Sequence, residues 1–197
     1  MLLRNGSLPW HGGVMPQIKD AAVLKAVAHP VRRRLLDVLR VDGPSMPSVL
    51  ARTTGQAVAN VSHHLRVLAE AGLIEEAPEL ARNRKEHWWR MPDRSISWST
   101  ADFAADAADI AAADAAMAIG LQRQVDLIST WLGSPAAREE PWSDAAFSTD
   151  GFLRLSPAEL AEMGAEIQAV MDRYAGRPET PDREPVFVIG RGFPARP

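Results

Sequence analysis

The chain has 197 residues, of which 46% are hydrophobic and 24% charged, and it contains no cysteine. This length fits one large domain or two small ones, and the composition is that of an ordinary globular protein. Without cysteine, disulfide scaffolds, thiol catalysis, iron–sulfur clusters and thiolate zinc sites are excluded. No apolar run is long enough to span a membrane, and the first residues lack the apolar stretch of a signal peptide. We therefore expect a cytoplasmic protein.

The net charge of −3 hides an asymmetry between the two halves of the chain. Residues 1–99 hold 14 Lys and Arg against 9 Asp and Glu, whereas residues 100–197 hold 8 against 16. The basic half suits an anionic partner, although solvated surface arginines would account for the same balance equally well.

The first part of the chain is predicted to be helical after a flexible leader. Residues 1–17 are rich in Gly and Pro and form this leader. From Asp20 onward apolar residues recur at helical spacing, which predicts a first helix. His29-Pro30 interrupts the pattern, and Pro30 suits the first turn of a second helix that ends at Gly43-Pro44.

Two further helices and two strands are expected next. Ser45 is a suitable N-cap for a short third helix, and Gly55 separates it from a fourth helix over residues 57–71. Strands are predicted over 73–77 and 85–91, with the loop 78–84 between them. A short turn between two helices, followed by a hairpin, is the order of a helix-turn-helix with a wing.

The fourth helix has one apolar and one polar face. Four apolar residues fall within an arc of about 80° and are expected to be buried: Val58, Val61, Leu65 and Leu68. The opposite face carries Asn60, His63 and Arg66, flanked by Ser62 and His64. These side chains can reach base edges or phosphates in a major groove, and Glu70 is the one acid near them.

Two stretches resemble a known family of regulators. Residues 61–74 are similar to the recognition helix and first wing strand of arsenic-repressor-like (ArsR/SmtB) winged-helix regulators, and residues 28–36 resemble that family's second helix. The resemblance covers about residues 20–91. It implies a winged helix-turn-helix that dimerises and places its fourth helix in the major groove of DNA, with the wing beside the phosphates.

The predicted interface combines base and phosphate contacts. We expect base or near-base contacts from Gln56, Asn60, Ser62, His63 and Arg66, with His64 nearer the backbone. Phosphate contacts are expected from Arg32, Arg33, Arg82, Arg84 and Lys85. Arg34 could share the phosphate role or simply be solvated.

The sequence departs from the family's pattern in two places. Metal-sensing members place Cys in the third helix, or His and Asp in a C-terminal helix. Here the third helix has no Cys, His, Asp or Glu, and the helix after the wing has Asp but no His. Carboxylates alone bind borderline metals poorly, so we expect a non-metal-sensing regulator without a cofactor. Gln56-Ala57 also replaces the Ser or Thr cap of many members, which leaves the start of the recognition helix open.

A long Ala-rich helix is predicted over residues 101–132. Its apolar stripe runs through Phe103, Ile110, Met117, Leu121, Val125, Ile128 and Leu132. A domain of about 70 residues cannot cover a stripe of that length, so we favour a homodimer interface over packing within the chain.

The C-terminal third is predicted to be a small α+β region. Asp150-Gly151 indicates a hairpin between 145–148 and 152–155, and residues 186–189 form a short strand. Ser156, Pro157 and Glu159 open a helix with a capping box. Five residues could line a pocket for a small-molecule effector: Trp131, Trp142, Phe147, Phe152 and Met163. We favour the alternative that they form the core of this region.

Together these features predict a mainly α protein with small β elements. The expected domains are a leader (1–17), a winged helix-turn-helix (18–98), a dimerisation helix (99–133) and a C-terminal region (134–197). No nucleophile elbow, metalloprotease motif or phosphate-binding glycine loop occurs, so no enzyme is expected. The predicted function is a DNA-binding transcriptional regulator, most simply a repressor. The alternative is a winged-helix protein-interaction module that does not bind DNA.

Overall fold

The structure is a computed structural model that describes residues 21–92, 107–178 and 180–196. The chain divides into two compact units, one within residues 13–123 and the other from residue 124 onward, and each is described by itself. The predicted leader and Phe103 lie outside the described residues. Among the residues that are described, no helix is long and apolar enough to cross a membrane.

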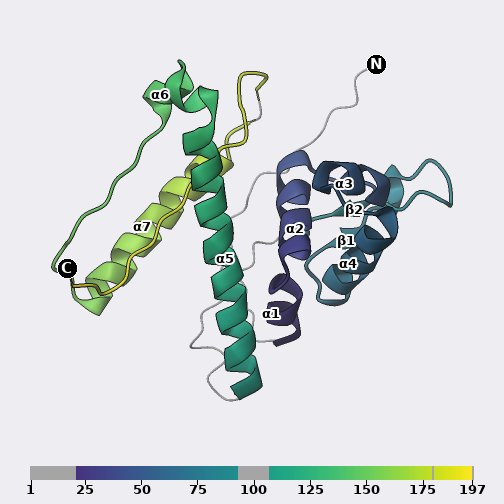
Figure 1. Cartoon of the computed structure of the whole chain (residues 1–197), viewed down its shortest axis with the longest axis horizontal. Coiled ribbons are helices and arrows are strands. Elements are labelled where there is room, and N and C mark those ends of the chain that lie inside the picture. Colours follow the sequence, from purple (N-terminus) through teal and green to yellow (C-terminus); the bar gives the residue numbers. More distant parts are fainter. Residues whose placement is uncertain (1–20, 93–106, 179, 197) are drawn as a thin grey trace. The chain divides into compact units, whose positions relative to one another are not determined.

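Four helices open the first unit, as the sequence predicts: α1 (Ala21–Val27), α2 (Pro30–Asp42), α3 (Pro47–Thr54) and α4 (Val58–Glu70) (Figure 1). The break between α1 and α2 has a local cause. The Val31 backbone N–H donates to Nδ1 of His29 at 3.2 Å, so this ring caps α2, and Pro30 occupies the first turn. The α2 helix ends at Gly43, whose φ of 77° lies where glycine is favoured.

The core of this unit lies where the helices meet. Its fully buried side chains are Leu24, Leu35, Leu39, Leu50, Val61, Leu65 and Leu68. Burial of each such side chain stabilises the fold by about 1.5–3 kcal/mol. The prediction for Val58 was wrong, because this residue begins α4 beyond the edge of the core and is 49% exposed.

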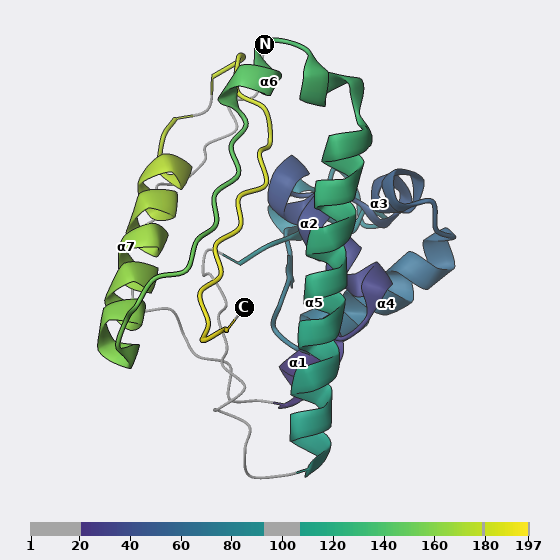
Figure 2. The ribbon, with the colours of Figure 1, turned by 60° about the vertical axis from the view of Figure 1, so that its left-hand side comes forward.

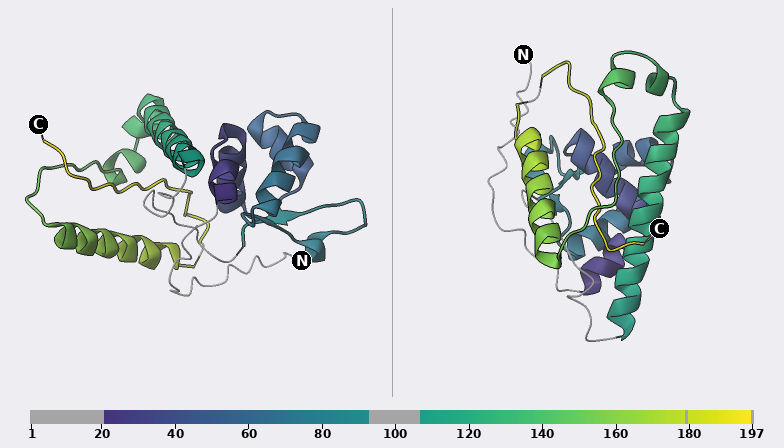
Figure 3. Two further views of the ribbon diagram at one scale, coloured as in Figure 1. Left: turned by 90° about the horizontal axis from the view of Figure 1, so that it is seen from below. Right: turned by 90° about the vertical axis from the view of Figure 1, so that its left-hand side faces the viewer.

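A two-stranded antiparallel hairpin follows α4. Strand β1 (Glu75–Glu76) pairs with β2 (Trp89–Arg90), and a short 3₁₀ helix, η1 (Pro78–Leu80), lies between them. Both strands are shorter than predicted. In Figure 3, left, the loop of the hairpin projects beyond the helices of this unit.

Ser45 corrects a second prediction. It does not cap α3, whose N-cap is Met46 without a side-chain hydrogen bond. Ser45 instead pairs with Trp89, since the backbone N–H of each donates to the carbonyl oxygen of the other at 2.9 Å. The backbone before α3 thus extends the small sheet and attaches the hairpin to the helical core.

The long predicted helix is present as α5 (Ala107–Gly133). In the first unit, its residues Ala113 and Ala116 are buried in the core, and Arg123 forms an ion pair with Asp37 of α2. Its apolar stripe is exposed, with exposed fractions from 43% to 62% at Ile110, Met117, Leu121, Val125, Ile128 and Leu132.

The second unit contains the end of α5, a 3₁₀ helix η3 (Pro135–Arg138), a short α6 (Trp142–Ala145) and α7 (Pro157–Ala175). The predicted capping box is confirmed. Ser156 Oγ accepts from the Glu159 backbone N–H, and the Glu159 carboxylate accepts from the Ser156 N–H. The helix ends at Ala175, and Gly176 is its C-cap residue.

The predicted strands of this second unit are absent from its described residues. Residues 146–155 and 186–193 are extended but form no ladder, so the α+β prediction was wrong there (Figure 2). The tail runs back along α7, where Gly190 approaches Ile167 and Gly192 approaches Leu160. An added Cβ at Gly192 would meet Leu160 Cδ1 at 2.8 Å, so a larger residue there would require the Leu160 side chain to move.

The effector-pocket prediction also fails for two of its five members. Phe147 is 77% exposed and Phe152 is 73% exposed, so neither ring lines an enclosed apolar site. Met163 is 39% exposed, while Trp131 and Trp142 are half-buried. Among the described residues from 124 onward, not one side chain is buried.

Candidate nucleic-acid interface

The turn between α3 and α4 fixes the direction in which α4 leaves the core. Gly55 adopts the left-handed conformation, with φ 68° and ψ 27°. The Gln56 backbone N–H donates to the Ala51 carbonyl at 3.0 Å, and the Gly55 N–H donates to the Arg52 carbonyl at 3.3 Å. This is a Schellman ending, which satisfies the last carbonyls of α3. A residue with a side chain at position 55 would strain the turn.

The outer face of α4 presents polar side chains to solvent. Asn60, His63 and Arg66 are exposed, while Gln56 and Ser62 are half-buried. Asn60 Nδ2 donates to Gln56 Oε1 at 2.9 Å, and the Ser62 hydroxyl donates to the Val58 carbonyl at 2.9 Å. The structure therefore brings together five of the six predicted base-contacting or nearby residues.

His64 does not belong to this face. It is only 6% exposed, and its ring lies 4.5 Å from that of His29, centroid to centroid. Burial lowers the pKa of both imidazoles, with further lowering by neighbouring positive groups that include Arg32 and His63. His64 thus lies in the buried arc of α4, which is wider than the four apolar residues alone, so the predicted contact with the DNA backbone was wrong.

Arg32 and Arg33 are turned toward the protein. Arg32 donates through Nε to the Ala26 carbonyl at 2.6 Å and through Nη2 to the Lys25 carbonyl at 2.7 Å. It thereby caps the C-terminal end of α1. Burial lowers the pKa of the Arg33 guanidinium, opposed by the nearby Asp37 carboxylate. Arg32 is thus held at the end of α1, and Arg33 is half-buried, so neither is an exposed cation as the phosphate-contact prediction requires.

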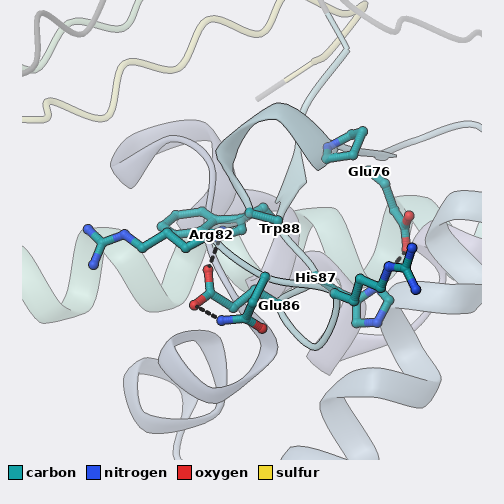
Figure 4. Close-up of a pocket in the computed structure, with 9 residues that line it drawn as sticks. Glu76, Arg82, Glu86, His87 and Trp88 are labelled. Atoms are coloured by element: carbon teal, nitrogen blue, oxygen red, sulfur yellow. Dashed lines mark hydrogen bonds and ion pairs between the residues drawn. The ribbon is translucent and has the colours of Figure 1, made fainter.

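The wing loop carries three exposed cations, Arg82, Arg84 and Lys85. Its backbone is held by Glu86, whose carboxylate accepts from the Arg82 backbone N–H and from Asn83 Nδ2, both at 2.9 Å (Figure 4). These bonds lower the pKa of Glu86, the one from the Arg82 backbone most of all. The Lys85 N–H donates to Asn83 Oδ1 at 3.0 Å, which closes the turn.

Ion pairs and two tryptophans stabilise the base of the wing, which is the β1–β2 hairpin. Arg90 contacts both Glu75 and Glu79, and the His87 ring lies 3.3 Å from Glu76. Trp89 packs against the core, while Trp88 helps to line an open cavity of about 400 Å³ beneath the loop. In Figure 4, Arg82 and Glu86 lie beside Trp88, whereas Glu76 and His87 lie together at the opposite side.

Two exposed arginines extend the cationic surface beyond the predicted set. Arg34 is exposed and donates to the Thr53 carbonyl at 3.4 Å, at the end of α3. Arg52, which the sequence interpretation missed, is exposed in the last turn of α3. Arg52 directly follows the buried pair Leu50-Ala51, and this position was the signal in the sequence that could have predicted its exposure. Within the described ranges, no group of three His, Cys, Asp or Glu is arranged to hold a metal ion.

Comparison with known proteins identifies the module that carries this face. A sequence-family model described as a helix-turn-helix domain matches residues 27–77, which span α2, α3, α4 and β1. The match agrees with the observed turn and helix order. Residues 27–77 are therefore similar to a helix-turn-helix domain, a module through which transcriptional regulators bind DNA.

Solved structures with partial similarity include three regulators. The transcriptional repressor BigR from Xylella fastidiosa is 25% identical, with 53% of this chain and 83% of that chain covered and a TM-score of 0.33. A possible transcriptional regulator for arsenical resistance is 24% identical, with 56% and 84% covered and a TM-score of 0.31. The homodimeric winged helix-turn-helix DNA-binding domain of Mb0332 from Mycobacterium bovis, a possible ArsR-family regulator, is 21% identical. The similarity covers 62% of this chain and 86% of that domain, with a TM-score of 0.33. No curated protein sequence matches the chain.

Proposed function

We propose that the chain is a sequence-specific, DNA-binding transcriptional regulator that works in the cytoplasm. The observation that carries this proposal is the exposed polar face of α4, where Asn60, His63 and Arg66 stand beyond a turn fixed by Gly55. In this proposal α4 enters the major groove, and these side chains meet base edges.

The wing loop supplies the backbone contacts in this proposal. Arg82, Arg84 and Lys85 are exposed on a loop whose backbone is already held by Glu86 and Asn83. Phosphate contacts of this kind fix the register of a protein on DNA and make its affinity depend on salt. Arg34 and Arg52 add exposed cations on the helical side.

We further infer that the regulator acts as a homodimer. The apolar stripe of α5 supports this, because six large side chains along it stay 43% to 62% exposed within the chain. A two-fold dimer would present two copies of α4 to half-sites about 34 Å apart. Repression is the outcome we infer, since a dimer bound at a promoter would exclude other proteins from the same DNA.

Fluorescence anisotropy against the DNA upstream of the chain's own gene tests the proposal. Unrelated DNA of equal length is the control, and each titration is made at two salt concentrations. We expect tighter binding to the upstream DNA and a steep loss of affinity with salt. Weak and equal binding to every duplex, including pools of random sequence, would overturn the proposal and favour a winged-helix module that binds proteins.

A further inference from the structure

We infer that Asn60 reads the adenine of an A·T pair with both atoms of its amide, and that Gln56 is the positioning residue that orients this amide. The inference rests on the proposed function and names the base that this part of the site recognises. It is carried by the contact between two side chains that are brought together at the start of α4.

The backbone places both residues where a recognition helix meets bases. Asn60 is the third residue of α4, is exposed, and is the one Asn or Gln in that helix. The N-terminal residues of a recognition helix are those that contact base edges. Gln56 lies in the turn, and its own backbone N–H is held by the Ala51 carbonyl at 3.0 Å.

The hydrogen bond between the two side chains couples the orientation of the Asn60 amide to that of the Gln56 amide. Asn60 Nδ2 donates one hydrogen to Gln56 Oε1 at 2.9 Å. While Gln56 keeps Oε1 toward Asn60, turning the Asn60 amide over would bring its oxygen against that acceptor, which removes the bond and adds repulsion. The second hydrogen on Nδ2 and the oxygen Oδ1 remain as an adjacent donor and acceptor.

Adenine is the base that matches this pair in the major groove. It presents N7 as an acceptor and the N6 amino group as a donor, so Nδ2–H meets N7 while Oδ1 accepts from N6. Guanine presents O6 in place of that amino group, which would oppose Oδ1. Ser62 does not compete as a donor, because its hydroxyl is already bonded to the Val58 carbonyl.

Selection from random duplexes, followed by binding to the selected site, tests the inference. The full-length wild type is compared with Asn60→Ala, Gln56→Met and Gln168→Met. Gln56→Met keeps the length of the side chain and removes its hydrogen bond. Gln168→Met is the matched control, because Gln168 also bonds a residue four positions along a helix, Asp172 of α7.

The wild type should select one strongly preferred A·T pair in each half-site. Asn60→Ala should lose the preference at that pair alone, by about 5- to 100-fold, and Gln56→Met should weaken it less. Replacing that adenine by 7-deazaadenine, which lacks the N7 acceptor, should weaken wild-type binding about 5-fold and leave Asn60→Ala unaffected. Gln168→Met should match the wild type throughout.

The possible failures are separable. A wild type that selects no sequence would overturn the proposed function and this inference together. A clear motif whose A·T preference survives Asn60→Ala would overturn the inference and leave the proposed function standing. If Asn60→Ala abolishes the preference while Gln56→Met leaves it intact, the positioning role of Gln56 is wrong.

Discussion

The two units of this chain differ in how far they bury their apolar surfaces. In the unit within residues 13–123, the apolar faces of α2, α3 and α4 are covered by one another, and seven large side chains are fully buried. In the described residues from 124 onward, α7 has an equally regular apolar stripe, yet no side chain is buried; the stripe consists of Leu160, Met163, Ile167, Val170 and Tyr174. The same periodicity therefore marks an internal core in one unit and an uncovered face in the other.

This difference teaches that a periodic pattern identifies the face of a helix that must be covered, but not what covers it. Exposed apolar patches on this scale are unusual in monomers and mark interaction sites. The second unit is thus expected to depend on contacts beyond its own packing, such as those of the proposed homodimer, whereas the first unit should be stable by its own packing.

Truncation of a core side chain in the first unit should have the largest effect. Leu65 is fully buried, and Leu65→Ala should lower the free energy of unfolding by about 2–5 kcal/mol. Ile167→Ala, in the stripe of α7, is the control, and Ile167 is 40% exposed. Chemical denaturation of the full-length chain measures both. An equal loss from the two substitutions would contradict the proposed contrast.

A charge in the stripe of α5 should act on association rather than on folding. Leu121 is 50% exposed, and Leu121→Lys should weaken the dimer at least tenfold, because each subunit would bury a charge in the interface. Ser129→Lys, at an exposed polar position of the same helix, should leave it unchanged. Sedimentation equilibrium gives the dissociation constants. Dimers that resist Leu121→Lys would place the interface elsewhere.

Loss of the capping box should destabilise α7 by a smaller amount. Ser156→Ala removes the acceptor of the Glu159 N–H, which costs about 1 kcal/mol in typical helices. Hydrogen exchange should therefore accelerate in the first turns of α7 while the core helices α2 and α4 keep their protection. Faster exchange in α4 would show that the two units unfold together.

The two buried histidines should make the first unit sensitive to acid. Folding lowers the pKa of His29 and His64. Below about pH 6.5 the unfolded chain therefore binds protons at these residues that the folded chain does not bind. The free energy of unfolding should fall as the pH drops through 6.5, and level off below the lowered values. Urea denaturation at pH 7.5 and 5.5 measures this loss. The loss of unfolding free energy between the two pH values should be smaller in His64→Gln and unchanged in His87→Gln, since His87 is exposed.

Local signals in the sequence predicted the helices because each signal acts within a few residues. Pro30, Gly55 and the Ser156 capping box fix helix ends through their own backbone and side-chain bonds. The exposed face of α4 could be predicted from the spacing of its apolar residues for the same reason. Asn60, His63 and Arg66 lie opposite the apolar arc, and that arc is buried at three of its four positions.

The failed predictions concern contacts between distant segments. His64 is buried because His29 lies beside it, and Arg32 is occupied because the end of α1 offers it two carbonyls. Neither partner can be found from the period of a single helix. The strands predicted around Asp150-Gly151 do not form, because a turn signal is local and a two-stranded hairpin is marginal without further packing against it.

The salt dependence of DNA binding tests the central claim most directly, namely that the surface formed by α4 and the wing binds DNA. Affinity for the selected duplex is measured over a series of salt concentrations for the wild type, Arg84→Ala and Arg154→Ala. Both arginines are exposed, one in the wing and one in the second unit. The slope of log affinity against log salt should fall in magnitude by about one for Arg84→Ala and stay unchanged for Arg154→Ala. An unchanged slope for Arg84→Ala, or an equal fall for both variants, would contradict the claim.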